Sequence, residues 1–276
     1  AQNFTTATDS FNVAVGYQAG NDVTTGVKNT LIGAQAADNL TTGKNNVAVG
    51  YLALETEDTG DRSVAVGSFT LRNQNNDADN YNTAVGYAAG LSVTTGVNNT
   101  IVGGLAGDAL TTGNNNVAIG GEALSSDTLG SLSTAVGLQA LANQNFTTAT
   151  NSFNTAIGSE AGEQITTGTV NTLIGSRAGD ALTTGSNNVA LGGGALGADD
   201  VGSKTVSIGV DSLAAQNFTT ATDSFNVAVG YGAANGITTG VRNTLIGALA
   251  GDVLTDADSN VAVGTNALGA DTLGSK

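Results

Sequence analysis

The sequence contains no proline, cysteine, methionine, tryptophan or histidine. Without cysteine, a disulfide framework and a thiolate metal site are both excluded. Without histidine, the usual general base of enzymes and the commonest transition-metal ligand are missing. Because methionine is absent even from position 1, we expect the sequence to be a piece of a longer chain. These absences favour a non-catalytic protein that requires no cofactor and no metal ion.

Charge is also scarce, and one sign dominates. Charged residues make up 11% of the 276 residues, and the formal net charge is −15. A phosphate-bearing partner requires Lys and Arg, so we expect neither nucleic acid nor an anionic membrane surface as a partner. No apolar run approaches the roughly 18 residues of a membrane-spanning helix, and no signal peptide is visible. We therefore expect no membrane insertion in this segment.

Glycine is abundant, and it closes a short motif that repeats along the chain. The motif is a polar residue, Val or Thr, a small or apolar residue, a β-branched residue or Leu, and then Gly. The closing glycines are evenly spaced within groups of four, as at Gly16, Gly33, Gly50 and Gly67, and the step to Gly86 in the next group is longer. We expect one repetitive domain over residues 1–276, built from four-unit super-repeats of roughly 70–72 residues. Longer connections near 68–81, 138–153 and 210–225 close these super-repeats.

The short period indicates the fold class. A repeat of about 17 residues is too short for a pair of helices, and Gly, Asn and Thr are poor helix formers. Stretches such as Val47-Ala48-Val49 are typical of short strands, and a second short strand is expected before each Thr-Thr-Gly, for example at 23–25 and 165–167. Two strands and two turns per repeat predict an all-β protein, a parallel β-solenoid of about fifteen coils stacked about 4.8 Å apart.

The polar residue that opens each strand is expected to stack on its counterpart in the next coil. Asn side chains form hydrogen-bonded ladders and also cap turns. The closing Gly would allow a positive φ where the chain turns sharply. The predicted ladder consists of Asn12, Asn29, Asn46, Asn82, Asn99, Asn116, Asn154, Asn171, Asn188, Asn226, Asn243 and Asn260.

Both faces of each strand are apolar or small, which is typical of a strand buried on both sides. A coil this short can enclose only one face, so the other would form an apolar stripe. We assign the central strand position to this stripe, with Ala14 and its equivalents in most coils and Leu31, Ile101, Leu173 and Leu245 once per super-repeat. Parallel association of identical chains would bury the stripe. On this assignment Leu173→Asp should loosen the oligomer more than Thr166→Asp.

The stretch Gly43-Lys44-Asn45-Asn46-Val47-Ala48-Val49-Gly50-Tyr51-Leu52-Ala53 resembles the head repeat of the trimeric autotransporter adhesins, G-x-N-S-V-A-I-G-x-x-S-x-A. The segments 82–86 and 94–96 are similar to the N-T-A-V-G and T-T-G arrays of phage and bacterial tail-fibre-domain proteins. The resemblance covers nearly the whole chain, although the adhesin repeat is usually a few residues shorter. It implies a left-handed β-roll, a homotrimer, and an extracellular fibre shaft or adhesive head on a cell surface or virion.

The long connections are the candidate recognition loops, because binding residues are common on loops held by a rigid scaffold. An alternative interpretation is that their aromatic rings fold back and fasten each loop onto the roll. The expected partners are further copies of the chain and a host-surface receptor or glycan. The candidate recognition residues are Phe4, Phe11, Phe146, Phe153, Phe218 and Phe225.

Other functions have weaker support. The acidic clusters 55–58 and 199–200 could belong to a fibre-borne, glycan-binding depolymerase with paired carboxylates, but we interpret them as solvated turn residues. Segments 77–80 and 256–260 carry oxygen ligands without the full spacing of a calcium loop. An ice-binding solenoid is a further alternative, but the Thr pairs are interrupted in the third coil of each super-repeat. We expect a structural or adhesive segment of an extracellular fibre.

Overall fold

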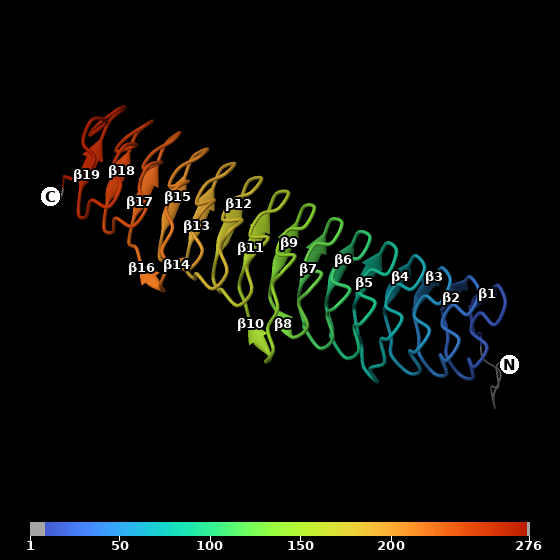
Figure 1. Cartoon of the computed structure of the whole chain (residues 1–276). Helices are drawn as coiled ribbons and strands as arrows, with labels where there is room; N and C mark the ends of the chain where they lie inside the picture. Colours follow the sequence, from blue (N-terminus) through green and yellow to red (C-terminus); the bar gives the residue numbers. More distant parts are fainter. Residues whose placement is uncertain (1–8, 275–276) are drawn as a thin grey trace. The chain divides into compact units, whose positions relative to one another are not determined.

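A computed structural model describes residues 9–274, and all regular secondary structure within this range is β-strand (Figure 1). Residues 9–274 contain no helix that is long and apolar enough to cross a membrane. The described residues form two compact units. The first contains residues 9–133 and 146–150, and the second contains residues 134–145 and 151–274.

In the first unit, one short strand per repeat stacks on the strand of the next repeat, which forms a parallel sheet in the order β1 to β7 (Figure 1). The strands are β1 Val13–Val15, β2 Thr30–Ile32, β3 Val47–Val49, β4 Val64–Val66, β5 Thr83–Val85, β6 Thr100–Val102 and β7 Val117–Ile119, followed by the shorter β8 Gly130–Ser131.

The second unit repeats this arrangement in the order β9-β11-β12-β13-β15-β17-β18-β19. Its main strands are β9 Thr134–Val136, β11 Thr155–Ile157, β12 Thr172–Ile174, β13 Val189–Leu191, β15 Val206–Ile208, β17 Val227–Val229, β18 Thr244–Ile246 and β19 Val261–Val263. A two-stranded parallel sheet pairs β14 Gly202–Ser203 with β16 Thr222–Asp223, and β10 is Thr150–Asn151. With seven main strands in the first unit and eight in the second, the parallel β-solenoid of about fifteen coils is confirmed.

The strand register reproduces the sequence period. Thr30 pairs with Val47 and Val47 pairs with Val64, so each pair is offset by one repeat. Val64 then pairs with Thr83 across the first long connection. The extra residues of that connection therefore lie outside the sheet, and the strand stack continues in register within the unit.

The expected second strand before each Thr-Thr-Gly is not present at residues 23–25 or 165–167, which have bend rather than strand geometry. The amides of Thr24 and Gly26 both donate to the carbonyl of Thr41, over 2.9 and 3.2 Å. One carbonyl thus serves two amides, which is incompatible with the regular bonds of a parallel ladder. The segment still stacks coil on coil, but it does so as a bend.

The assignment of the strand faces was wrong. The central side chain points into its own coil: Leu31, Leu173 and Ala48 are at most 1% exposed within a single chain. The flanking side chains point outward and are half-buried or exposed in every main strand. A charge at Leu173 would therefore enter the core of a coil and not an interface between copies.

The core of each coil is narrow. In the second coil it is made by Leu31, Ala36, Ala37 and Leu40, each no more than 1% exposed. Two turn residues after the closing Gly adopt the left-handed conformation, as at Gln35 (φ 57°) and Ala37 (φ 48°). These turns fold the chain around the core and direct the central strand residue inward.

Candidate functional site

The predicted asparagine ladder lies inside the coils, where it binds backbone groups of its neighbours. Asn46 is fully buried, and its amide donates to Asn29 Oδ1 over 2.9 Å. Its Nδ2 donates to the carbonyl of Gly60 over 2.8 Å, and its Oδ1 accepts from the amide of Ser63 over 2.8 Å. Equivalent bonds recur within each super-repeat, whereas the amides of Asn154 and Asn226, which follow long connections, donate to Ser152 and Ser224 Oγ over 3.3 and 3.2 Å. From Asn29 to Asn260 their side chains are at most 4% exposed, so this column joins coils and presents no binding surface.

A second buried polar column occupies the position seven residues after the closing Gly. Two coils of each super-repeat place Val, Leu or Ile there, and the next two place an acid and then Gln. In the first unit, Gln74 Nε2 donates to Glu57 Oε2 over 2.8 Å. Gln74 Oε1 accepts from Asn82 Nδ2 over 2.8 Å, which connects the carboxylate to the asparagine ladder.

The second unit contains the same relay in Asp199, Gln216 and Asn226. Gln216 Nε2 donates to Asp199 Oδ2 over 2.6 Å, and Gln216 Oε1 accepts from Asn226 Nδ2 over 2.8 Å. The amides of Gly202 and Phe218 donate to Asp199 Oδ1, over 3.1 and 3.4 Å. The carboxylate therefore holds the long connection that contains Phe218 against the preceding coil.

Burial dominates the electrostatics of these carboxylates. It raises the pKa of Glu57, although hydrogen bonds from Gln74 and from the amides of Gly60 and Asn76 act in the opposite direction. Burial likewise raises the pKa of Asp199, against hydrogen bonds from Gln216, Gly202 and Phe218. The hydrogen bonds to both acids come from neutral donors, so desolvation is only partly compensated.

The interpretation of both acidic clusters as solvated turn residues is thus wrong for Glu57 and Asp199, which are fully buried. The sequence did contain a signal for their role. An acid at one position of the repeat, with Gln at the same position of the next repeat, recurs at 57 and 74, at 127 and 144, and at 199 and 216. That recurrence indicates a stacked, hydrogen-bonded pair inside the solenoid.

The phenylalanines of the long connections divide into two kinds. Phe146 and Phe218 are each 5% exposed and fasten their loops to the coil, whereas Phe11, Phe153 and Phe225 are 69, 55 and 49% exposed. Phe4 lies outside the described residues. The ammonium of Lys204 lies 5.3 Å from the ring centre of Phe225. Among these described phenylalanines, Phe11, Phe153 and Phe225 are therefore the ones accessible to a partner.

The outward face of the sheet is apolar and carries no charged residue in either unit. The first residues of the main strands form one outward column, which contains Val or Thr in no regular order. The third residues form the other column, which contains Val, Ile and Leu. The exposed members include Ile32, Val85 and Ile119 in the first unit and Ile157, Leu191 and Ile246 in the second, each between 37 and 42% exposed. We call the surface formed by the first and third residues of the main strands the sheet face.

The Thr pairs do not form a uniform outward array. The first hydroxyl of each pair is used within the solenoid, since Thr24 Oγ1 donates to the carbonyl of Thr41 over 3.2 Å. Thr41 Oγ1 donates to the carbonyl of Asp58 over 3.1 Å. The column then changes to Asp58-Thr59, so its regular spacing of hydroxyl groups ends after two coils.

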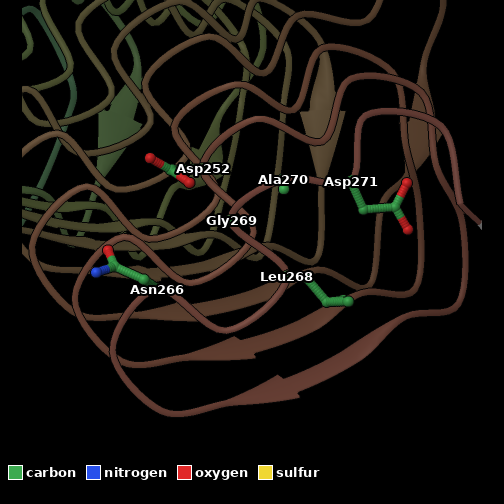
Figure 2. A pocket seen from close by; sticks show the side chains of 6 residues that line it. All are labelled: Asp252, Asn266, Leu268, Gly269, Ala270 and Asp271. Carbon is green, nitrogen blue, oxygen red and sulfur yellow. The ribbon is translucent and has the colours of Figure 1, made fainter.

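The acidic segments do not assemble into a cation site. No group of three or more Asp or Glu side chains that could hold a metal ion occurs within residues 9–274. In the 77–80 segment, Asp77 accepts from Thr59 Oγ1 over 2.6 Å, and Asp79 forms an ion pair with Arg62. A hollow of about 510 Å³ lies at the last described coil. Figure 2 shows that the carboxylates of Asp252 and Asp271, which line it, lie apart and do not converge.

No protein-family model and no curated protein matches this chain.

Proposed function

We propose that this chain is a structural and adhesive, non-catalytic segment of an extracellular fibre, in which three parallel copies associate through their sheet faces. The single observation that carries the proposal is the composition of these faces. A chain with 23 acidic residues has none at the outward positions of its main strands. Soluble proteins normally place charge on exposed strands, which limits edge and face association.

The size of the sheet face supports association. Seven strands about 4.8 Å apart and three residues wide give a strip of roughly 300 Å² per unit. Contiguous apolar patches of this size on soluble proteins commonly mark interaction sites. The sheet face of another copy is the partner that fits this strip best, because its columns of Val and Ile side chains repeat at the same spacing along the stack of coils.

The trimer and the left-handed roll are proposed from the resemblance to trimeric adhesin heads, and a cell or virion surface is the corresponding location. Rotation about an axis lets three identical strips meet while the turns and long connections remain outside. Ice binding is the less favoured alternative, because the first hydroxyls of the Thr pairs bond within the solenoid and the pairs are interrupted.

Light scattering of the purified segment tests the proposal directly. We expect a mass three times the 27.0 kDa of one chain. Ile157→Asp places a charge on the sheet face at a position that is 40% exposed and should shift the protein toward monomer. Thr167→Asp, at an exposed position of the same coil, is the matched control and should remain trimeric. A stable monomer for the unmutated segment at micromolar concentration would contradict the proposed association.

A further inference from the structure

Three aromatic side chains from successive coils of the first unit meet just beyond the ends of β3, β4 and β5. The rings of Tyr51 and Phe69 lie 5.4 Å apart at 78°, and those of Phe69 and Tyr87 lie 5.9 Å apart at 85°. Tyr51 is 45% and Tyr87 is 60% exposed, whereas Phe69 is half-buried. We call Tyr51, Phe69 and Tyr87 the aromatic cluster.

The fold does not require aromatic residues at these positions. The residue that follows the closing Gly, where Tyr51 and Tyr87 lie, is Ala, Ser or Gly in several other coils, including Ala34, Ser68 and Gly104. Phe69 has a φ of 62°, in the left-handed region that a bulky residue adopts at a cost. Because exposed rings contribute little to the core, the cluster is better explained by binding than by stability.

An ion pair lies beside the aromatic cluster. The guanidinium carbon of Arg72 lies 5.7 Å from the ring centre of Phe69. Arg72 Nε donates to Glu55 Oε2 over 2.6 Å, and the two side chains remain 40 and 22% exposed. The patch therefore combines accessible ring faces with a planar hydrogen-bond donor and a carboxylate acceptor.

We propose that the aromatic cluster, with Arg72 and Glu55, is a binding site for a neutral hexopyranose glycan. The C–H groups on one face of a pyranose carry partial positive charge and pack on the negative faces of aromatic rings. The sugar hydroxyls can accept from Arg72 and the phenols and donate to Glu55. The net charge of −15 selects against anionic glycans. This inference deepens the proposed adhesive role and rests on it.

A protein partner fits the patch less well. A stable protein interface buries about 800 Å² on each side, whereas the cluster presents one residue per coil over three coils. Tyr side chains are rigid, and binding through them costs little conformational entropy. An extended oligosaccharide that follows the coil axis could contact successive rings.

Affinity electrophoresis in gels that contain a soluble neutral polysaccharide tests the site. The probes are a β-glucan, a galactomannan and dextran, with anionic alginate for comparison. We expect retardation of the unmutated protein by at least one neutral polysaccharide and not by alginate. The double variant Tyr51→Ser/Tyr87→Ser should bind at least tenfold more weakly. Tyr231→Ser is the matched control: Tyr231 is 62% exposed at the equivalent position, next to Val210 and Ala248 in its column, and its loss should change nothing.

Each outcome decides the proposal. Retardation that is lost in the double variant and kept in the control supports the site. No retardation by any neutral polysaccharide, equal retardation of the double variant, or an equal loss in Tyr231→Ser would overturn it. Light scattering and thermal melting of each variant, in the same buffer, report association and folding separately. The glycan proposal can thus be contradicted while the trimer is confirmed, and the trimer can be contradicted while glycan binding is confirmed.

Discussion

Gly103 and Gly104 are neighbours in the chain with opposite structural requirements. Gly103 closes β6 with a φ of +140°, and a Cβ there would lie 2.3 Å from the carbonyl oxygen of Gly120 in the next coil. A Cβ added at Gly104 would have no neighbouring atom within 4 Å. The first glycine is required both by its own conformation and by the close approach of two backbones.

We therefore expect Gly103→Ala to lower the free energy of unfolding by about 3 kcal/mol or more, since backbone strain and a backbone clash act together. Gly104→Ala is the adjacent control and should be neutral or stabilise by up to about 1 kcal/mol. Urea unfolding followed by circular dichroism measures both. Equal effects of the two substitutions would contradict the stacked arrangement of the closing glycines.

Asn116 represents the ladder at mid-stack in the first unit. Its amide donates to Asn99 Oδ1 over 2.9 Å, its Nδ2 donates to the carbonyl of Gly130 over 3.0 Å, and its Oδ1 accepts from Ser133. We expect Asn116→Leu to destabilise by about 1–3 kcal/mol, because buried backbone groups lose their partners. The control is Asn39→Ala, at an exposed position. An unchanged melting temperature for Asn116→Leu would exclude a stabilising role for the ladder.

At the scale of the element, the long connections depend on buried acids. Glu57 accepts from the amide of Asn76, and Asp199 accepts from that of Phe218, each over 3.4 Å. Each acid replaces an apolar residue of the same column, so two coils of every four have a partly polar core. Such networks are stabilising only where every member is satisfied.

The raised pKa values of Glu57 and Asp199 predict how stability depends on pH. A carboxyl with a pKa raised by folding binds its proton more tightly in the folded state. Its contribution is fully present below the ordinary values of 4.5 and 3.8 and is lost as pH rises through the folded-state value. We therefore expect the free energy of unfolding to increase as pH falls from neutral toward these values.

Thermal melting from pH 7 to pH 4 measures this dependence. Asp199→Asn should reduce the change of melting temperature with pH, because the substitution removes a titrating carboxyl and keeps one acceptor oxygen. Asp211→Asn, at an exposed position of the second unit, should leave the pH profile unchanged. Stability that only decreases on acidification, with identical profiles for both variants, would contradict the role of the buried acids.

At the scale of the whole molecule, each coil contacts chiefly the coils before and after it, as in other repeat proteins. Leu31 and Ile101 occur once in every four coils of the central column, and alanines such as Ala48 fill the coils between them, so the core stays thin. Stability within each unit must therefore come largely from hydrogen bonds between coils. The outward Val, Ile and Thr residues stay half-buried or exposed in the single chain, which is why we assign them to association between chains.

The sequence by itself determined the period, the positions of the main strands, the column of asparagines and the parallel β-solenoid class, but not the geometry before each Thr-Thr-Gly. These features follow from local rules. Asn and Gly recur at fixed spacing, and a repeat this short is too short for a pair of helices but long enough for one coil of a solenoid. The same rules could not separate Phe146 from Phe153, because both are aromatic residues in one loop and only packing buries the first.

Only the tertiary structure decided which strand face is enclosed. Alternation along a strand defines two faces, but the turn after the closing Gly selects the inner one. That turn places residues such as Gln35 and Leu54 in the left-handed region, at φ values of 57 and 55°. Local propensity disfavours this conformation for both residue types, so the sequence does not signal it. Stacking against the adjacent coils imposes it, and with it the burial of Leu173 and the exposure of Ile157 and its equivalents.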